Sequence, residues 1–246
     1  MRLTKPERLL LFGPVGVILA IWLIIPALLG LAATFTNYAP AEPEVRWVGL
    51  RNFQLILADR TFAVAVRNIA IFTVVAVPLE LAIGFGLASL LRRPFRGRSI
   101  VRLVLLLPWL ISPVASGVMW HFLLDSETGF LNFAVRWLGL ASLPSPLSQH
   151  MLALPTVIGV ESWRMAPLVA FLLLPGLGAI PRDLWEHARL DGLSWSGRTR
   201  HVALPSMRPL VLAVTMLLVG GALATFDSVL TMTGGGPGTE TVTPAL

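Results

Sequence analysis

Long apolar segments alternate with short polar ones along this chain. Within lipid, backbone groups must find hydrogen-bond partners inside their own segment, so such segments are expected to be helices. A helix needs about 20 mostly apolar residues to cross a bilayer. Five segments reach that length, namely residues 9–35, 68–91, 103–124, 151–178 and 209–233.

Prolines interrupt several of these segments. They are Pro26, Pro78, Pro108, Pro113, Pro155 and Pro167. Neighbouring helices can satisfy the carbonyl groups that a proline frees, so we expect kinked helices without breaks. The predicted fold class is an all-α integral membrane bundle of five transmembrane helices, formed as one transmembrane domain over residues 1–246.

Basic residues predict the orientation of the bundle. Thirteen of the nineteen lie in the N-terminal segment, in the second loop and in the fourth loop, residues 179–208. The first and third loops hold few basic residues, and acidic residues offset them, which by the positive-inside rule places the N-terminus and loop 179–208 in the cytoplasm. Residues 9–35 are too long for a signal peptide and carry no cleavage site, so they form a retained span. Because five spans leave the C-terminus outside, we expect a further span to be missing after Leu246.

Composition narrows the class of protein. The chain is 55% hydrophobic and 13% charged, against about 25% charged residues in soluble domains. It has no cysteine, which excludes disulfides and thiolate metal sites. The four histidines lack ligand spacing, so no metal is expected. The net charge of +6 does not indicate nucleic acid, because the basic residues flank apolar segments facing a lipid bilayer.

Loop 179–208 predicts a hairpin of two short helices. Glu186 favours the positive end of the first helix. Gly192 is placed to leave that helix in a left-handed conformation, and Ser194 or Ser196 can cap the second helix. Taken alone, the loop is equally well explained as a solvated polar connection.

Four charged residues fall inside predicted spans, where charge is costly and indicates function. Glu161 and Arg164 are one helical turn apart and can pair, with a purely structural role as the alternative. Glu80 is assigned a structural role. Asp227 is expected near the outer end of the last span, within reach of water.

The motifs of loop 179–208 carry a family resemblance. They read Glu186-x-Ala188-x-x-Asp191-Gly192 and then Val202-x-Leu204-Pro205-x-x-x-Pro209. This pattern resembles the EAA loop of bacterial ABC importer permeases. Further matches are Gly49-Leu50-Arg51-Asn52-Phe53, Arg102-x-x-x-x-Leu107-Pro108-Trp109 and Thr233-x-Gly235-Gly236-Pro237. Together they resemble the carbohydrate-uptake branch, similar to the larger permease of maltose and glycerol-phosphate transporters. In this chain His187 and Leu193 replace alanines, and Thr199 replaces an aromatic residue.

The resemblance implies a docking role for the loop. The residues expected to couple the chain to an ATPase are Glu186, Ala188, Asp191, Gly192, Leu193 and Pro205. Ala188 is small enough to let a partner approach closely. The implied partners are a second, homologous permease, a cytoplasmic ATPase dimer and an extracytoplasmic sugar-binding protein in a bacterial inner membrane. ATP and magnesium would bind the ATPase, and this chain would hold no cofactor.

The resemblance also implies where a substrate would be held. The family's contacts come from the middle of the fourth and fifth spans and fall on Arg164, Met165, Leu168, Leu218, Ala222 and Thr225. Glu161, Trp163 and Asp227 are added as neighbouring candidates. Trp163 offers a sugar-stacking face, although packing is the commoner role of a tryptophan in a span. Because the stripe is mostly apolar, this chain would hold substrate weakly or leave binding to its partner.

Other functions remain as alternatives. The chain lacks the Gly-x-x-x-x-Gly-Lys motif of an ATP-hydrolysing loop, and its one lysine is Lys5. An intramembrane enzyme would need a catalytic pair, but His121 has only Ser112 and Ser116 nearby in sequence, without a matching motif. A proton-coupled transporter would work without ATP. A permease for another solute, such as glycerol phosphate, also fits the resemblance.

Overall fold

The computed structural model describes residues 13–38 and 44–246 of the chain. The start of the first predicted span, with Arg2, Lys5 and Arg8, and Glu42 of the first loop lie outside the described residues. The chain divides into two units, residues 1–60 and 61–246. Each unit is described by itself.

The first unit is an apolar helix followed by a structured loop. The helix covers Gly13–Ala33, with a π-helical turn η1 at Ala20–Ile24 and its last part α2 at Ile25–Ala33. After the loop comes α3, Arg51–Ala58. None of the described residues in the apolar window of this helix is buried.

The loop of the first unit is closed by the matched sequence Gly49–Phe53. The Asn52 side-chain amide donates hydrogen bonds to the carbonyls of Thr34 and Thr36, at 2.9 and 2.8 Å. Phe35 stacks on Trp47 with ring centroids 5.5 Å apart. The motif therefore anchors α3 to the end of the first helix.

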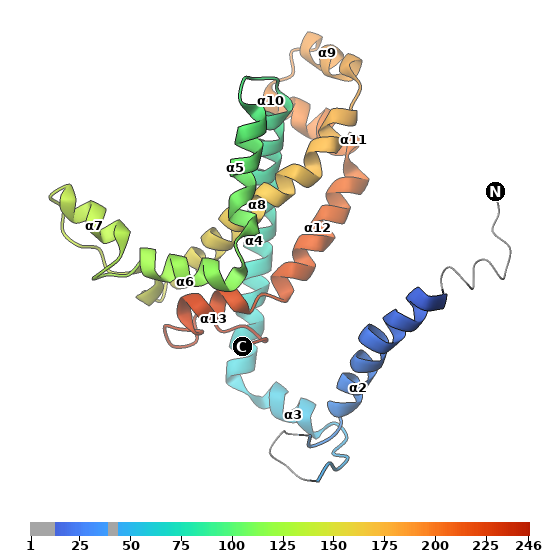
Figure 1. Ribbon diagram of the computed structural model, residues 1–246, viewed down its shortest axis with the longest axis vertical. Helices are drawn as coiled ribbons and strands as arrows, with labels where there is room; N and C mark the ends of the chain where they lie inside the picture. Colours follow the sequence, from blue (N-terminus) through green and yellow to red (C-terminus); the bar gives the residue numbers. More distant parts are fainter. Residues whose placement is uncertain (1–12, 39–43) are drawn as a thin grey trace. The chain divides into compact units, whose positions relative to one another are not determined.

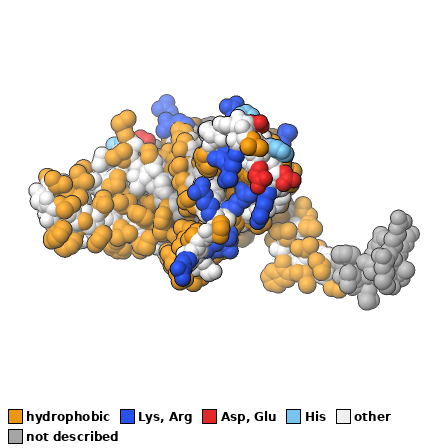
Figure 2. Space-filling view, turned by 90° about the horizontal axis from the view of Figure 1, so that it is seen from above, with side chains coloured by type: hydrophobic (Ala, Val, Ile, Leu, Met, Phe, Trp, Pro, Cys, Tyr) orange, Lys and Arg blue, Asp and Glu red, His pale blue; other side chains and the backbone are white. Residues whose placement is uncertain are grey.

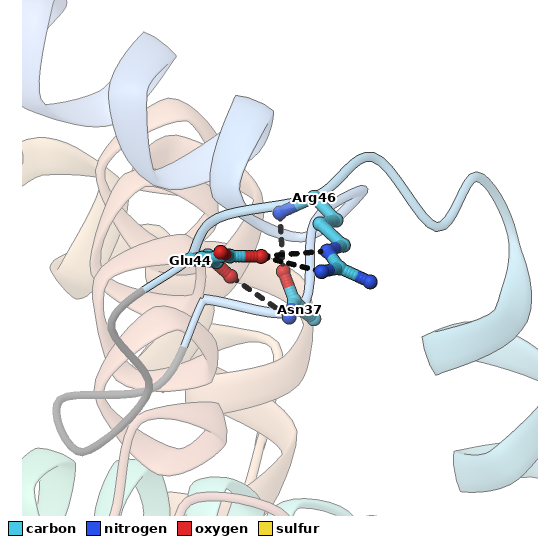
Figure 3. Close-up of polar contacts among 3 residues, drawn as sticks. All are labelled: Asn37, Glu44 and Arg46. Atoms are coloured by element: carbon cyan, nitrogen blue, oxygen red, sulfur yellow. Dashed lines mark hydrogen bonds and ion pairs between the residues drawn. The ribbon is translucent and has the colours of Figure 1, made fainter.

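Further polar contacts join Asn37, Glu44 and Arg46 in the same loop (Figure 3). The Asn37 amide donates to the Glu44 carbonyl at 3.1 Å, and the backbone N–H of Arg46 donates to Asn37 Oδ1 at 2.5 Å. The Arg46 guanidinium pairs with the Glu44 carboxylate. These exposed contacts fix local geometry, since surface ion pairs add little stability.

The second unit is a bundle of helices of very different lengths (Figure 1). The long α4, α8 and α12 run between an end that carries α9 to α11 and an end that carries α6 and α13. The α-helices are α4 Arg60–Arg92, α5 Arg98–Leu110, α6 Pro113–Leu123, α7 Phe130–Trp137, α8 Ala153–Ala179, α9 Arg182–Leu190, α10 Trp195–Arg198, α11 Leu204–Ser206, α12 Arg208–Leu223 and α13 Asp227–Thr233. A 3₁₀ turn η2 at Pro146–Ser148 precedes α8, and a π-helical turn η3 at Thr199–Ala203 joins α10 to α11.

Three described helices are each long and apolar enough to cross a membrane: Gly13–Ala33, α4 and α8. Two bent pairs reach that size only when taken together, α5 with α6 and Trp195–Ser206 with α12. Helix α4 begins eight residues before the predicted segment 68–91, and α8 matches 151–178 to within two residues. Both helices continue through internal prolines, Pro78 in α4 and Pro167 in α8. This agrees with the prediction that these prolines do not break the helices.

The prediction of one unbroken helix over 103–124 is wrong. The chain forms α5 and α6, whose axes differ by 91°. Pro113 opens α6, and the residue before a proline is pushed out of the helical region. Accordingly, Ser112 is extended at φ −59° and ψ 149°, and its hydroxyl accepts the Ala115 N–H at 3.2 Å. The serine cap stabilises the break that the proline creates.

The single helix predicted over 209–233 is also wrong. Helix α12 ends at Leu223, and α13 begins at Asp227. The Thr225 carbonyl, freed by the break, accepts the Thr243 hydroxyl at 3.2 Å. Helix α13 packs instead on α6, where the His121 ring nitrogen lies 2.8 Å from the Met232 carbonyl.

The core of the second unit lies between α4 and α8. Its largest enclosed side chains include Phe72, Leu173 and Leu177. A Cβ on Gly84 would lie 2.5 Å from the Val169 Cγ1, so only glycine allows the two helices to approach this closely. Such close packing matters because apolar burial does not drive helix association inside lipid.

Candidate functional site

A small cavity with three charged residues in its lining lies between the long helices of the second unit. Its volume is about 80 Å³. It is lined by two residues of α4, three of α8 and four of α12 and the turn that follows, namely Phe72, Glu80, Glu161, Arg164, Met165, Leu218, Gly221, Ala222 and Thr225. Six of the nine residues predicted to hold substrate therefore meet at one place.

The centre of this cavity is a buried ion pair. Arg164 donates from Nε and Nη2 to the two carboxylate oxygens of Glu161, and the two side chains are only 11% and 10% exposed. Ser228 donates its hydroxyl to Glu161 Oε2 at 3.0 Å. The pairing predicted from the spacing of these residues is confirmed. Because each charge would be costly alone, the pair and its serine hold the α8 side chains in one arrangement.

Glu80 lies at the same site as the ion pair. Its side chain is buried and lines the same cavity, although the sequence analysis assigned it a structural role and did not include it among the substrate residues. No described residue gives it a basic partner of its own. The described cavity thus combines two carboxyl groups with one guanidinium. The sequence offered one signal, a glutamate within an apolar segment.

Three predicted substrate residues lie outside the cavity. Trp163 packs edge-on against Trp120, with ring centroids 5.4 Å apart, which favours the packing role over sugar stacking. Leu168 is half-buried on α8. Asp227 is exposed at the start of α13. Because α12 ends at Leu223, Asp227 does not continue the helix face on which Leu218 and Ala222 lie.

The second candidate site is the hairpin of α9 to α11, called the coupling hairpin below. Helix α9 ends in a Schellman motif, in which the Leu193 N–H bonds the Ala188 carbonyl at 3.1 Å and the Gly192 N–H bonds the Arg189 carbonyl at 3.0 Å. Gly192 adopts φ +74°, as predicted. Ser194, rather than Ser196, caps α10 by accepting the Gly197 N–H at 3.2 Å.

The residues predicted to couple the chain to an ATPase differ in how exposed they are. Glu186, Asp191, Gly192 and Pro205 are exposed, and Leu193 is half-buried. Ala188 is only 4% exposed, so the expectation that its methyl group faces a partner is wrong. Its small size instead lets α9 pack within the hairpin.

The tip of the coupling hairpin carries an apolar side chain that the prediction omitted. Leu190 is 83% exposed and lies beside the left-handed turn. The turn of the hairpin therefore presents an apolar side chain beside the charged residues of the motif. The motif itself could have drawn attention to it, since it precedes Asp191 and Gly192 directly.

Comparison with known proteins agrees with this geometry. Residues 80–246 match the family described as binding-protein-dependent transport system inner membrane component. The chain is 30% identical over 240 residues to the trehalose/maltose transport system permease protein MalF of Thermococcus litoralis, covering 96% of this chain and 80% of that protein. It is 31% identical to the sulfoquinovosyl glycerol transport system permease protein SmoG of Agrobacterium fabrum, covering 96% and 77%.

A solved structure shares the fold. A chain of the bacterial alginate ABC transporter, crystallised in complex with an alginate pentasaccharide-bound periplasmic protein, superposes with a TM-score of 0.78 at 21% identity. The match covers 96% of this chain and 80% of that one. The family match and the two relatives together show that this chain belongs to the binding-protein-dependent transport system inner membrane components, the permease subunits of ABC transporters.

Proposed function

We propose that this chain forms half of the translocation pathway of an ATP-driven importer for a neutral sugar. The observation that carries the proposal is the cavity in which three charged residues meet between otherwise apolar helices. Intramembrane charges are rare and mark transport pathways, and here Arg164, Glu161 and Glu80 line one space. The relative named for trehalose and maltose transport supports the choice of substrate class.

The charges of the cavity favour a neutral sugar over an anionic one. Two carboxyl groups against one guanidinium offer hydrogen-bond acceptors to sugar hydroxyls and leave no spare positive charge. The relative named for sulfoquinovosyl glycerol transport supports an anionic sugar derivative as the second candidate. Glycerol phosphate is a third. Both would have to approach Glu80, which has no basic partner among the described residues.

The partners follow from the same proposal. A second, homologous permease would supply the other half of the pathway. A cytoplasmic ATPase dimer would bind the coupling hairpin and would itself bind magnesium and hydrolyse ATP. An extracytoplasmic binding protein would deliver the sugar. The chain itself performs no hydrolysis, and its N-terminus and coupling hairpin lie on the cytoplasmic side of the bacterial inner membrane.

Uptake into proteoliposomes tests the substrate class. The permease is reconstituted with the partner subunits encoded beside it, and uptake of labelled trehalose, sulfoquinovosyl glycerol and glycerol 3-phosphate is measured with and without ATP. Uptake of trehalose that requires ATP is the expected result. ATP-dependent uptake of an anionic solute alone would overturn the neutral-sugar assignment, and uptake without ATP would overturn the importer mechanism.

The Glu80→Gln variant sharpens this experiment. The change removes one carboxyl group and keeps the shape of the side chain. We expect it to relax discrimination against the anionic solutes while trehalose uptake persists. An unchanged ratio of anionic to neutral uptake would mean that Glu80 does not set the charge preference.

A further inference from the structure

A larger cavity lies at the other end of the second unit, beneath the coupling hairpin. Its volume is about 340 Å³, about four times that of the intramembrane cavity and within the range of roughly 300–1,000 Å³ typical of small-molecule sites. Five arginines line it, contributed by α4, the following loop, α9 and α10, together with one acidic residue: Arg92, Arg93, Arg182, Arg189, Arg198 and Glu186. This space is called the basic pocket below.

The arginines of the basic pocket lack enough acidic partners. Glu186 is the one acidic residue among the described residues that line it, and no ion pair joins it to any of the five. Arg92 lies within electrostatic range of Arg182 and Arg189, so like charges face one another across the pocket. Viewed from above, basic side chains surround a few acidic ones at this end of the molecule (Figure 2).

Two hydrogen-bond donors on the walls of the pocket are buried without an acceptor. They are Arg198 Nε and the indole nitrogen of Trp185, which have no partner among the described residues. A buried donor left without an acceptor destabilises the fold, so such a donor favours binding of a group that accepts its hydrogen bond. The Arg92 guanidinium lies 4.4 Å from the centre of the Trp185 ring, which holds both side chains in place. The site is therefore preformed, rich in donors and short of negative charge.

The position of the pocket indicates the source of an anion. It lies where α4 ends at Arg92 and where α8 approaches its own end, with Leu177 and Phe85 in its walls. Both helices are long enough to cross a membrane, and Arg92 directly follows the apolar segment 68–91 of α4, so this end of α4 is expected near the lipid headgroups. A basic pocket at the end of spanning helices is a site for an anionic headgroup.

We propose that the basic pocket binds a phosphate group, supplied by the headgroup of an anionic phospholipid, beneath the coupling hairpin. Arginine presents several N–H donors that match phosphate oxygens. The bound phosphate would relieve the repulsion among the arginines and tie α9 and α10 to the end of α4. The same chemistry could be met by free phosphate, which the experiment distinguishes.

Native mass spectrometry of the purified transporter tests the proposal. The complex of permease and partner subunits, in neutral detergent, is titrated with phosphatidylglycerol, with phosphatidylcholine, and with phosphatidylglycerol in the presence of inorganic phosphate. We expect retention of phosphatidylglycerol over phosphatidylcholine. Displacement of the lipid by millimolar inorganic phosphate would support the site and assign it to the soluble anion. Equal retention of the two lipids, with no effect of phosphate, would overturn the proposal.

Arginine variants localise the binding. Removing one arginine should weaken phosphatidylglycerol binding about five-fold, and Arg92→Gln with Arg189→Gln about thirty-fold. Arg96→Gln removes the same charge from the exposed loop after α4 without touching the pocket, and serves as the control. A double variant that binds like the control contradicts the site.

Ser89 provides a test that keeps every arginine. Its side chain lines the pocket, so Ser89→Asp places a carboxylate among the guanidinium groups and should displace the lipid, whereas Ser89→Asn of similar shape should not. Equal binding by these two variants would overturn the proposal. So would loss of the ATPase, rather than of lipid, in Ser89→Asp, since the pocket would then serve an acidic side chain of that partner.

Discussion

The intramembrane cavity and the basic pocket balance their charges in opposite ways. In the cavity, two carboxyl groups face one guanidinium, and the Glu161–Arg164 pair is about nine-tenths buried. In the pocket, five arginines face one glutamate and remain partly open to solvent. A site with surplus acid disfavours an anion, and a site with surplus base attracts one. The two regions should therefore differ in the ligand they take and in how far a substitution disturbs the fold.

The largest effect is expected from Glu161→Gln. The change leaves the Arg164 guanidinium buried without its partner, which costs about 3–5 kcal/mol. The apparent melting temperature of the detergent-solubilised protein should fall and expression should drop. Glu161→Gln combined with Arg164→Gln should recover part of the loss. If the double variant is no more stable than the single one, the pair is not the source of the cost.

Gly192→Ala should have the next largest effect. Gly192 has φ +74°, and a Cβ added to it would meet no other atom within 4 Å. The cost is therefore conformational strain of about 1–2 kcal/mol and not a clash. The coupling hairpin should distort while the long helices persist, and pull-down should show weaker ATPase association with uncoupled hydrolysis.

Gly197→Ala is the control for this variant on the same hairpin. A Cβ at Gly197 would meet ordinary contacts of 3.4–3.5 Å without a positive φ. We expect it to couple normally. Equal behaviour of the two alanine variants would show that the left-handed turn does not matter for docking.

Trp185→Leu tests a smaller contribution in the basic pocket. It removes the aromatic face beneath Arg92, a contact worth about 0.5–1 kcal/mol when partly exposed. Trp185→Phe keeps an aromatic face and should lose less. Thermal melts in the absence of anionic lipid measure both. A loss from Phe as large as that from Leu would assign the effect to the shape of the indole.

The smallest effect concerns Asp125 in the loop between α6 and α7. Hydrogen bonds from the backbone N–H groups of Thr128 and Glu127, and from the Thr128 hydroxyl, lower the pKa of Asp125. Its contribution is therefore fully present above the unfolded pKa and is lost as pH falls through the lower folded value. Proteolysis of this loop should increase on acidification in the wild type, and Asp125→Asn should be cleaved similarly at both pH values.

Hydropathy correctly predicted the continuous helices. It failed to predict the two breaks, one of which depends on a local residue pair and the other on a distant contact. Helices α4 and α8 followed from length and apolar composition alone. The break before α6 depends on Ser112, which caps a helix that begins with Pro113. Hydropathy averaged over a span-length window does not detect a signal of two residues. Serine followed by proline is a local signal that could have been used. The break after α12 has no such signal, since the freed Thr225 carbonyl is satisfied by Thr243.

The candidate site was predictable where a single helix determines it. The spacing of Glu161 and Arg164 was enough to predict their contact, and the position of Gly192 after α9 was enough to predict its conformation. Glu80 and the basic pocket required tertiary structure, because each brings together residues from separate helices. Ala188 was misplaced for a related reason: the sequence marks a small residue but not the side on which its neighbour lies.

Asn68 on α4 depends on hydrogen-bond acceptors that are synthesised much later in the chain. Its buried side-chain amide donates to the carbonyls of Thr239 at 2.9 Å and Val242 at 3.1 Å. A ribosome must add more than 170 residues after Asn68 before either acceptor exists. Closing so long a loop carries an entropic cost, and until then the amide needs water or another partner. Helix α4 is therefore made long before its buried amide can find these two acceptors, and the segment that contains Thr239 and Val242 holds it in place once that segment has folded.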